Sequence, residues 1–134
     1  MRVLLDTHTI LWWQADTGRL SGVAERIIGS AELLMISPLS CWEIATLARQ
    51  GRVMLDRGPA AWIGKLFREP RVALAPLTTE AAVWAGLLDR LTFPGDLIDR
   101  LIYASAHDLR VPLVTKDEKL RAYASQAGDI DVIW

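Results

Sequence analysis

The sequence predicts an α/β fold with a central, mostly parallel sheet, and two features support this prediction. Short apolar runs of strand length alternate along the chain with segments whose apolar residues recur at helical spacing, which is typical of a parallel sheet covered by helices on both faces. The first run, residues 3–5, is apolar at consecutive positions, as in a strand buried on both sides. We therefore expect a three-layer α/β/α sandwich.

The composition is that of one soluble domain. The chain has 134 residues, of which 51% are hydrophobic, so we expect residues 1–134 to form a single domain with a substantial core. Its formal net charge is −1, so binding to nucleic acid would need a local basic patch. Cys41 is the only cysteine, and the first ten residues do not resemble a signal peptide. These features indicate a cytoplasmic protein.

Turn and cap signals divide the chain into elements. Ser21 and Gly29 suit the start and the end of one helix, while Ser37-Pro38 supplies a cap and a first-turn proline for the next. Phe93-Pro94-Gly95 is a clear break between two later helices. We expect strands at residues 3–5, 33–36, 72–77, 112–115 and 130–134, and helices at residues 10–13, 21–28, 37–51, 59–67, 79–91, 96–109 and 117–124.

The helix predicted at residues 37–51 is apolar on more than one side. Its residues Cys41, Ile44, Ala45 and Ala48 follow helical spacing and predict the core-facing stripe. Large apolar residues outside this stripe, and further tryptophans elsewhere, suggest that a second chain covers part of the surface. We therefore expect a homodimer. The residues concerned are Leu39, Trp42 and Leu47 on this helix and Trp12, Trp13 and Trp62 elsewhere.

Four acidic residues stand where a predicted strand ends or a helix begins: Asp6, Glu43, Asp99 and Asp117. In open α/β sheets these are the places where a ligand crevice forms. Carboxylates gathered there without His or Cys partners suit a hard cation such as Mg²⁺ or Mn²⁺. The pattern therefore indicates a metal site at the carboxyl edge of the sheet.

Each acid also has a purely structural interpretation. Asp6, Asp96 and Asp117 are well placed to cap helices, and Asp99 lies in a first turn, where the helix dipole favours a negative charge. Ser40-x-x-Glu43 resembles a capping box, although Glu43 lies too deep for that role if Ser37 is the true cap. Taken singly, capping explains each residue. It does not explain why carboxylates recur at the strand ends of one sheet.

The chain resembles a PIN domain of the VapC type, the toxin nuclease of bacterial toxin–antitoxin pairs. The similarity covers nearly the whole chain, and four motifs in the same order support it. They are Leu4-Leu5-Asp6-Thr7-His8, Ser37-x-x-Ser40-x-Trp42-Glu43-Ile44-Ala45, Gly95-Asp96-x-x-Asp99-Arg100-Leu101-Ile102 and Pro112-Leu113-Val114-Thr115-Lys116-Asp117.

The resemblance implies a PIN-like sandwich and a Mg²⁺- or Mn²⁺-dependent endoribonuclease held inactive by a cognate antitoxin. It places Asp6, Glu43, Asp99 and Asp117 in the catalytic set, with the first three as metal ligands. Asp96 is an additional acid found in some relatives. Thr7 and Thr115 match hydroxyl positions beside the acids.

Bound metal would reverse the local negative charge, so that an anionic phosphodiester can approach. The RNA backbone would then need nearby cations, for which Arg100, Lys116, Lys119 and Arg49 are candidates. Two other functions remain open at this stage. One is a metal-dependent phosphatase or phosphotransfer domain that uses Asp6, and the other is a catalytically silent PIN-like interaction module.

Overall fold

Five parallel strands form the central sheet of the computed structural model, which describes residues 1–134. The strands are β1 (Arg2–Leu5), β2 (Leu33–Ile36), β3 (Val72–Leu74), β4 (Leu113–Val114) and β5 (Val132–Ile133). Their order is β3-β2-β1-β4-β5. The first strand is therefore central, and the order reverses there, between β1 and β4. Such a reversal opens a crevice at the carboxyl ends of the strands.

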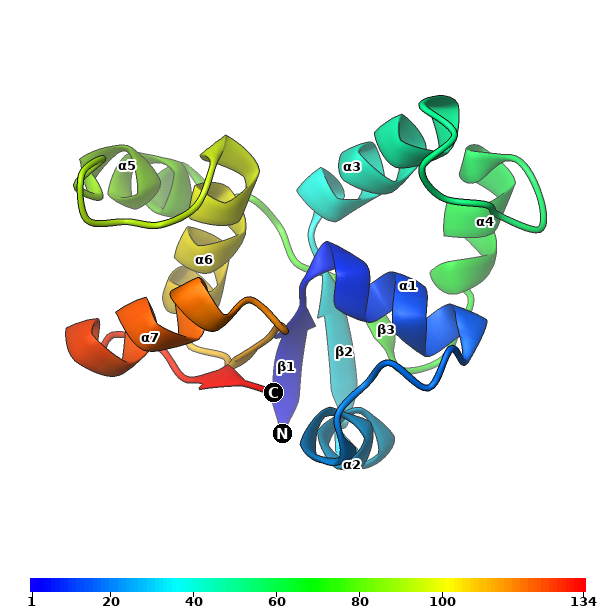
Figure 1. Cartoon of the computed structure of the whole chain (residues 1–134), viewed down its shortest axis with the longest axis horizontal. Helices are drawn as coiled ribbons and strands as arrows, with labels where there is room; N and C mark the ends of the chain where they lie inside the picture. The colour runs from blue at the N-terminus through cyan, green and yellow to red at the C-terminus, as the bar shows by residue number, and fades with distance from the viewer.

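Seven helices cover the two faces of the sheet (Figure 1). They are α1 (Thr7–Ala15), α2 (Gly22–Ser30), α3 (Pro38–Arg49), α4 (Pro59–Leu66), α5 (Thr79–Leu87), α6 (Leu97–Leu109) and α7 (Glu118–Ala127). Helices α1 to α4 share one apolar cluster with the sheet, whereas α6 and α7 share another and α5 packs on α6. This arrangement confirms the predicted three-layer α/β/α sandwich. None of the helices combines the length and the apolar character that crossing a membrane requires.

The alternation of side chains along β1 joins the two layers. Val3 and Leu5 belong to the cluster under α1 to α4, whereas Leu4 belongs to the cluster under α6 and α7. All three side chains are fully buried. A strand buried on both faces shows no polar alternation in its sequence, which is the reason that the unbroken apolar run predicted β1 correctly.

The face of α3 that enters the core agrees only in part with the prediction. Ile44, a member of the predicted stripe, is buried, and so are Ser40 and Leu47 outside it, while the other three members of the stripe are half-buried. The centre of the buried face is therefore shifted toward Ser40 and Leu47, and a buried serine interrupts its apolar pattern. Leu47 is thus a core residue and not part of an apolar surplus, and Trp42 is 59% exposed.

Several element boundaries also differ from the prediction. Helix α1 begins directly after β1, three residues earlier than expected, and α2 continues through Gly29, whose surroundings leave room for a side chain. Helix α5 ends at Leu87, because Leu88 is already extended, so residues 88–95 form a loop. The early start of α1 matters for function, since it places the first helical turn at the end of the central strand.

We expect Leu4→Ala to lower the free energy of unfolding by about 2–5 kcal/mol, because it leaves a cavity at the centre of the sheet. Urea denaturation measures this change. Leu74→Ala is the matched control: Leu74 is 53% exposed on the edge strand β3, and its loss should cost less than about 1 kcal/mol. Equal losses in both variants would contradict the central position of β1.

Candidate acidic active site

Asp6 lies at the junction of β1 and α1 and is held from two sides. It is the N-cap of α1, and its Oδ1 accepts a hydrogen bond from the Thr7 amide at 2.8 Å. Its Oδ2 accepts one from the Thr115 hydroxyl at 2.7 Å. Thr115 follows β4, the strand beside β1. The Asp6 carboxylate is therefore fixed across the carboxyl ends of the two central strands.

A second pair of hydroxyls supports this junction from α3. The Thr7 hydroxyl donates to the Ser40 hydroxyl at 3.0 Å, and both residues are fully buried. This bond connects the first turn of α1 to the first turn of α3. The sequence placed Ser40 in a family motif and offered it as a possible cap, but it did not predict this contact with Thr7. A polar residue on the apolar face of a helix was the signal that could have identified it.

Asp96 and Asp99 form a reciprocal capping box at the start of α6. The Asp99 amide donates to Asp96 Oδ1 at 2.9 Å, and the Asp96 amide donates to Asp99 Oδ2 at 3.1 Å. Asp96 is the N-cap, as predicted, and it is exposed, whereas Asp99 is half-buried. The two acids thus differ in environment although they lie in the same helical turn.

Gly95 allows Asp99 to lie close to the preceding loop. A Cβ atom at position 95 would overlap Asp99 Cβ and would lie only 2.9 Å from both Asp99 Oδ2 and a ring carbon of Phe93. Van der Waals contact normally needs about 3.5–4.0 Å between carbon atoms. Any larger residue at this position would therefore displace the Asp99 side chain.

Burial and mutual repulsion raise the pKa of two of the acids. Burial is the largest cause for Asp6, and the neighbouring Asp117 adds to it, while hydrogen bonds from Thr115 and Thr7 partly offset the rise in pKa. The pKa of Asp99 is raised to about 7, first by burial and then by the charges of Asp96 and Asp6. Asp6 and Asp99 are therefore close enough to repel each other, although β1 and α6 are far apart in sequence.

Asp117 joins the same group through Thr115. It is the N-cap of α7, where its Oδ1 accepts hydrogen bonds from the Lys119 and Leu120 amides at 2.9 and 3.1 Å. Its own amide donates to the Thr115 hydroxyl at 3.2 Å. Thr115 therefore touches both Asp6 and Asp117, which explains why the charge of Asp117 affects the pKa of Asp6.

Glu43 lies in the second turn of α3 and is half-buried. Ser37 is the N-cap of this helix, and its hydroxyl accepts from the Leu39 amide at 3.1 Å. Ser40 is therefore not the cap, and Glu43 lies too far along α3 to close a capping box with Ser37. Helix α3 packs against both α1 and α6, which carry Asp6 and Asp99 at their starts. Among the four acids, only Glu43 has no capping role.

The chemistry of the four acids suits a divalent metal. In this structure, however, no three of these side chains are arranged as a group that could hold a metal ion. Asp6, Asp99, Asp117 and Glu43 supply only oxygen ligands, and none of them has a basic partner within ion-pair distance. A buried carboxylate without a counter-charge costs free energy. Mg²⁺ supplies that charge and retains several waters, so it needs few protein ligands.

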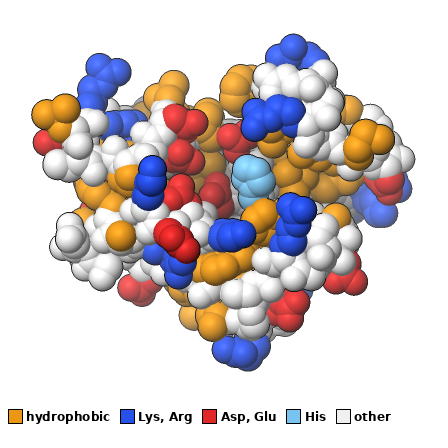
Figure 2. Space-filling model, viewed as in Figure 1, with side chains coloured by type: hydrophobic (Ala, Val, Ile, Leu, Met, Phe, Trp, Pro, Cys, Tyr) orange, Lys and Arg blue, Asp and Glu red, His pale blue; other side chains and the backbone are white.

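Cations surround this acidic cluster. Figure 2 shows Asp and Glu side chains in a hollow in the middle of one face, with Lys and Arg side chains around its rim. Arg49, Lys116 and Lys119 are exposed. The Arg100 guanidinium instead donates to the Leu88 carbonyl at 2.9 Å and lies over the Phe93 ring. This anchors Arg100 at the end of α5.

Comparison with known proteins identifies the family. The family model for the PIN domain matches residues 3–126. Ribonuclease VapC22 of Mycobacterium tuberculosis (strain ATCC 25618 / H37Rv) is 40% identical over 121 residues, which are 90% of this chain and 91% of that protein.

Solved structures share the fold at lower sequence identity. DNA-bound VapBC from Salmonella typhimurium is 18% identical with a TM-score of 0.67, covering 98% of this chain and 96% of that one. VapC20 of Mycobacterium tuberculosis, described as a sarcin-ricin loop cleaving toxin, is 17% identical with a TM-score of 0.63, covering 98% and 99%. The match to the PIN-domain model spans most of the chain, and the relationship to VapC22 spans most of both proteins. The chain therefore belongs to the PIN-domain family.

Proposed function

We propose that the chain is a metal-dependent endoribonuclease that acts as the toxin of a toxin–antitoxin pair. The main support is the cluster of Asp6, Asp99 and Asp117, which lie near the carboxyl ends of the central strands without a basic partner. The ribonuclease activity named for VapC22, a relative of similar length, agrees with this chemistry.

In this proposal Asp6, Glu43 and Asp99 would hold Mg²⁺ or Mn²⁺, with Asp117 beside them as a further acid of the site. A bound metal would supply an activated water for attack on phosphorus and positive charge for the leaving oxygen. Thr115 keeps the Asp6 carboxylate in place, and Thr7 ties the same turn to α3 through Ser40. Asp96 holds Asp99 through the capping box and is not itself a ligand.

The RNA backbone needs positive charge, because the acids alone would repel it. Lys116 and Lys119 flank Asp117 in sequence, and Arg49 ends α3. We propose these three exposed residues as phosphate contacts. Arg100 is a weaker candidate, since its Nη1 atom already donates to carbonyls at the end of α5.

One observation favours the alternative of a catalytically silent module: three of the four acids have ordinary capping roles. Asn would cap equally well and would avoid the repulsion that raises the pKa of Asp99. The presence of half-buried carboxyls with raised pKa values is thus better explained by metal binding. A phosphatase built on Asp6 is a weaker alternative, because it gives no role to Glu43.

We propose that a cognate antitoxin inhibits the enzyme. The structural neighbours include VapBC complexes from Salmonella typhimurium and Rickettsia felis, and these share the fold of the chain. The acidic cluster lacks a basic partner within the chain, so a Lys or Arg of a bound partner would find a favourable charge there. Such a side chain would compete with both metal and substrate.

We also propose that the chain forms a homodimer, through α5 and not through the tryptophans that the sequence suggested. Trp13 and Trp62 pack against the core cluster of α1 to α4. Four of the ten exposed large apolar residues lie on α5, the loop after it and the start of α6, and exposed apolar patches mark interaction sites. They are Val83 (63% exposed), Leu87 (79%), Leu91 (94%) and Leu97 (67%).

Asp6→Asn and Asp99→Asn should each lower the rate of RNA cleavage by at least about 100-fold while the protein stays folded, because each removes a ligand charge with little change in volume. Cleavage of a labelled single-stranded RNA in Mg²⁺ measures the rate, and EDTA should abolish it. Asp96→Asn is the matched control: Asn caps about as well as Asp, so activity should change little. Full activity in both Asp6→Asn and Asp99→Asn would refute the proposal.

Without metal, the protein should become less stable as the pH rises from about 4 to about 7. The folded state keeps the Asp99 proton up to a pKa of about 7, against 3.8 ordinarily, so it binds more protons than the unfolded state across this range. Thermal melts in EDTA should show a falling Tm, and Asp99→Asn should flatten the curve. Mg²⁺ should raise the Tm above pH 7 and have little effect near about pH 4, where protons compete with it. A Tm that rises with pH in wild type and variant alike would contradict the assignment.

Val83→Lys should convert the dimer to a monomer, because it places a charge in the apolar face of α5. Size-exclusion chromatography with light scattering at micromolar concentration measures the mass. Val23→Lys, on α2 in the other layer, replaces another exposed valine and should leave the dimer intact. A wild-type protein that is already monomeric would exclude this interface.

A further inference from the structure

We propose that the pocket beside Trp12 binds a nucleobase of the RNA strand next to the cleaved phosphate. This inference rests on the proposed ribonuclease function, and it adds a specificity subsite to it. Three lines of evidence support the subsite: the shape of the pocket, the cations around the Trp12 ring, and the position of that ring relative to Asp6.

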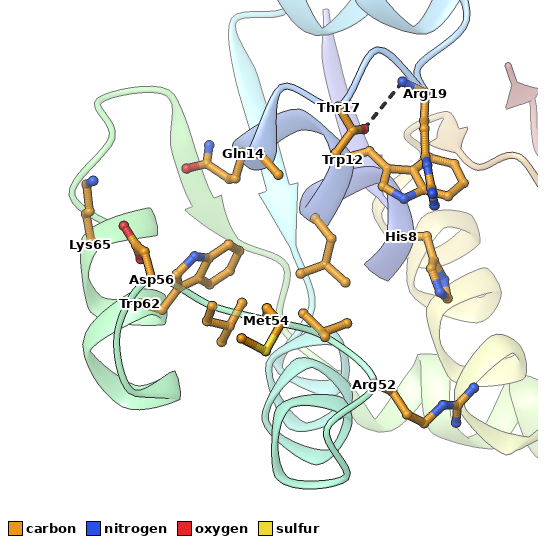
Figure 3. Close-up of a pocket in the computed structure, with 14 residues that line it drawn as sticks. His8, Trp12, Gln14, Thr17, Arg19, Arg52, Met54, Asp56, Trp62 and Lys65 are labelled. Atoms are coloured by element: carbon orange, nitrogen blue, oxygen red, sulfur yellow. Dashed lines mark hydrogen bonds between the residues drawn. The ribbon is translucent and has the colours of Figure 1, made fainter.

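The pocket has a volume of about 470 Å³ and lies between α1, the loop after α3 and α4 (Figure 3). Its apolar lining includes Trp12, Trp62 and Met54, and Met54 is 94% exposed. A pocket of this size with mixed apolar and polar walls is typical of small-molecule and nucleotide sites. None of the residues that line this pocket belongs to the acidic cluster or to the proposed metal ligands.

Two cations lie against the Trp12 ring. The Arg19 guanidinium carbon is 5.7 Å from the centre of the ring, and the Lys116 ammonium nitrogen is 5.3 Å from it. The rings of His8 and Trp134 lie 5.8 and 5.9 Å away. Single-stranded RNA is bound by aromatic rings on which bases stack, with cations beside them for the phosphates. Trp12 and its surroundings supply both the aromatic ring and the neighbouring cations.

The position of Trp12 connects the pocket to the acidic cluster. Asp6 caps α1, and His8 and Trp12 follow on one side of that helix, four residues apart. The rise of an α-helix places Trp12 about 9 Å along the axis from Asp6. Lys116 directly follows Thr115, which bonds to Asp6. A strand with a phosphate at the acids can therefore place a neighbouring base at Trp12.

The charge around the pocket favours a nucleic acid over a protein partner. Arg19, Arg52 and Lys65 line it, and Lys116 lies at its edge over Trp12. The one acid in the lining, Asp56, is paired with Arg57 at 3.2 Å. This surplus of positive charge would repel the basic inhibitor segment that the acidic cluster attracts, and it suits an anionic ligand with an aromatic ring.

Binding of a labelled single-stranded oligoribonucleotide in EDTA, measured by fluorescence anisotropy, tests the proposal without cleavage. Trp12→Ala should weaken binding about 5- to 100-fold, the range measured for loss of one stacked base, and Trp12→Phe should restore part of it. Lys116→Gln, at an exposed position, should also weaken binding and reduce its salt dependence. Trp42→Ala removes an exposed tryptophan outside the pocket and should have no effect.

Abasic substitution identifies the base itself. An abasic nucleotide at one fixed distance from the cleavage site should weaken binding to the wild type but not to Trp12→Ala, since that variant has already lost the stack. Equal binding by wild type, Trp12→Ala and Lys116→Gln, together with normal cleavage in Mg²⁺, would overturn the subsite and leave the ribonuclease intact. Loss of antitoxin binding in Trp12→Ala, with RNA binding unchanged, would assign the pocket to a protein and also overturn it. Binding that depends on Trp12 without any cleavage would instead refute the proposed ribonuclease function.

Discussion

The hydrogen bond between Thr115 and Asp6, 2.7 Å long, is the interaction on which the candidate site depends. It joins residues that are 109 positions apart in the sequence, and it exists because β1 and β4 pair in parallel at the centre of the sheet. Thr9 adds a second connection, since its hydroxyl donates to the Val114 carbonyl at 3.0 Å. The start of α1 is thereby attached to β4, and these hydrogen bonds fix the Asp6 carboxylate relative to the sheet.

The fixed position of Asp6 near other acids costs free energy. Held near Asp99 and Asp117, Asp6 forms no ion pair with its own chain, and its pKa rises because burial disfavours the charged form, an effect that the nearby His8 only partly offsets. The metal-free protein therefore holds negative charges that repel one another. Under the proposed function, relief of this repulsion would contribute part of the affinity for a divalent cation. Strain of this kind is common at functional sites, where stability is given up for chemistry.

The sequence predicted the layers correctly, and it predicted that Asp6, Asp99 and Asp117 lie near one another, because both features depend on local signals. An unbroken apolar run identifies a central strand, and an Asp after a strand marks the carboxyl edge wherever parallel strands end. The roles of Ser40 and Gly95 lay beyond such reasoning. Ser40 is buried because α3 meets α1 at Thr7, and Gly95 matters because the loop passes close to Asp99. Both are consequences of long-range packing.

The same limit explains the errors at the surface. Four tryptophans, Trp12, Trp13, Trp42 and Trp62, suggested an apolar surface for a second chain. Of these only Trp42 is exposed, because the exposure of a tryptophan depends on which helix packs over it. Trp62 meets the core, whereas α5, which is apolar on nearly every side, leaves Val83 and Leu87 uncovered. For Trp12 the decisive neighbours, Arg19 and Lys116, come from different parts of the chain.

Separation of charge reconciles the proposed action on an anionic polymer with a net charge of −1. The acids gather in one hollow, and the cations lie around it and along the Trp12 pocket (Figure 2). Without a metal, the acids in the hollow would repel an approaching phosphate. The cations along the pocket would attract it with or without the metal. In the proposed enzyme, substrate binding and catalysis would therefore depend on different residues, so that an inhibitor bound in the hollow would block cleavage without filling the pocket.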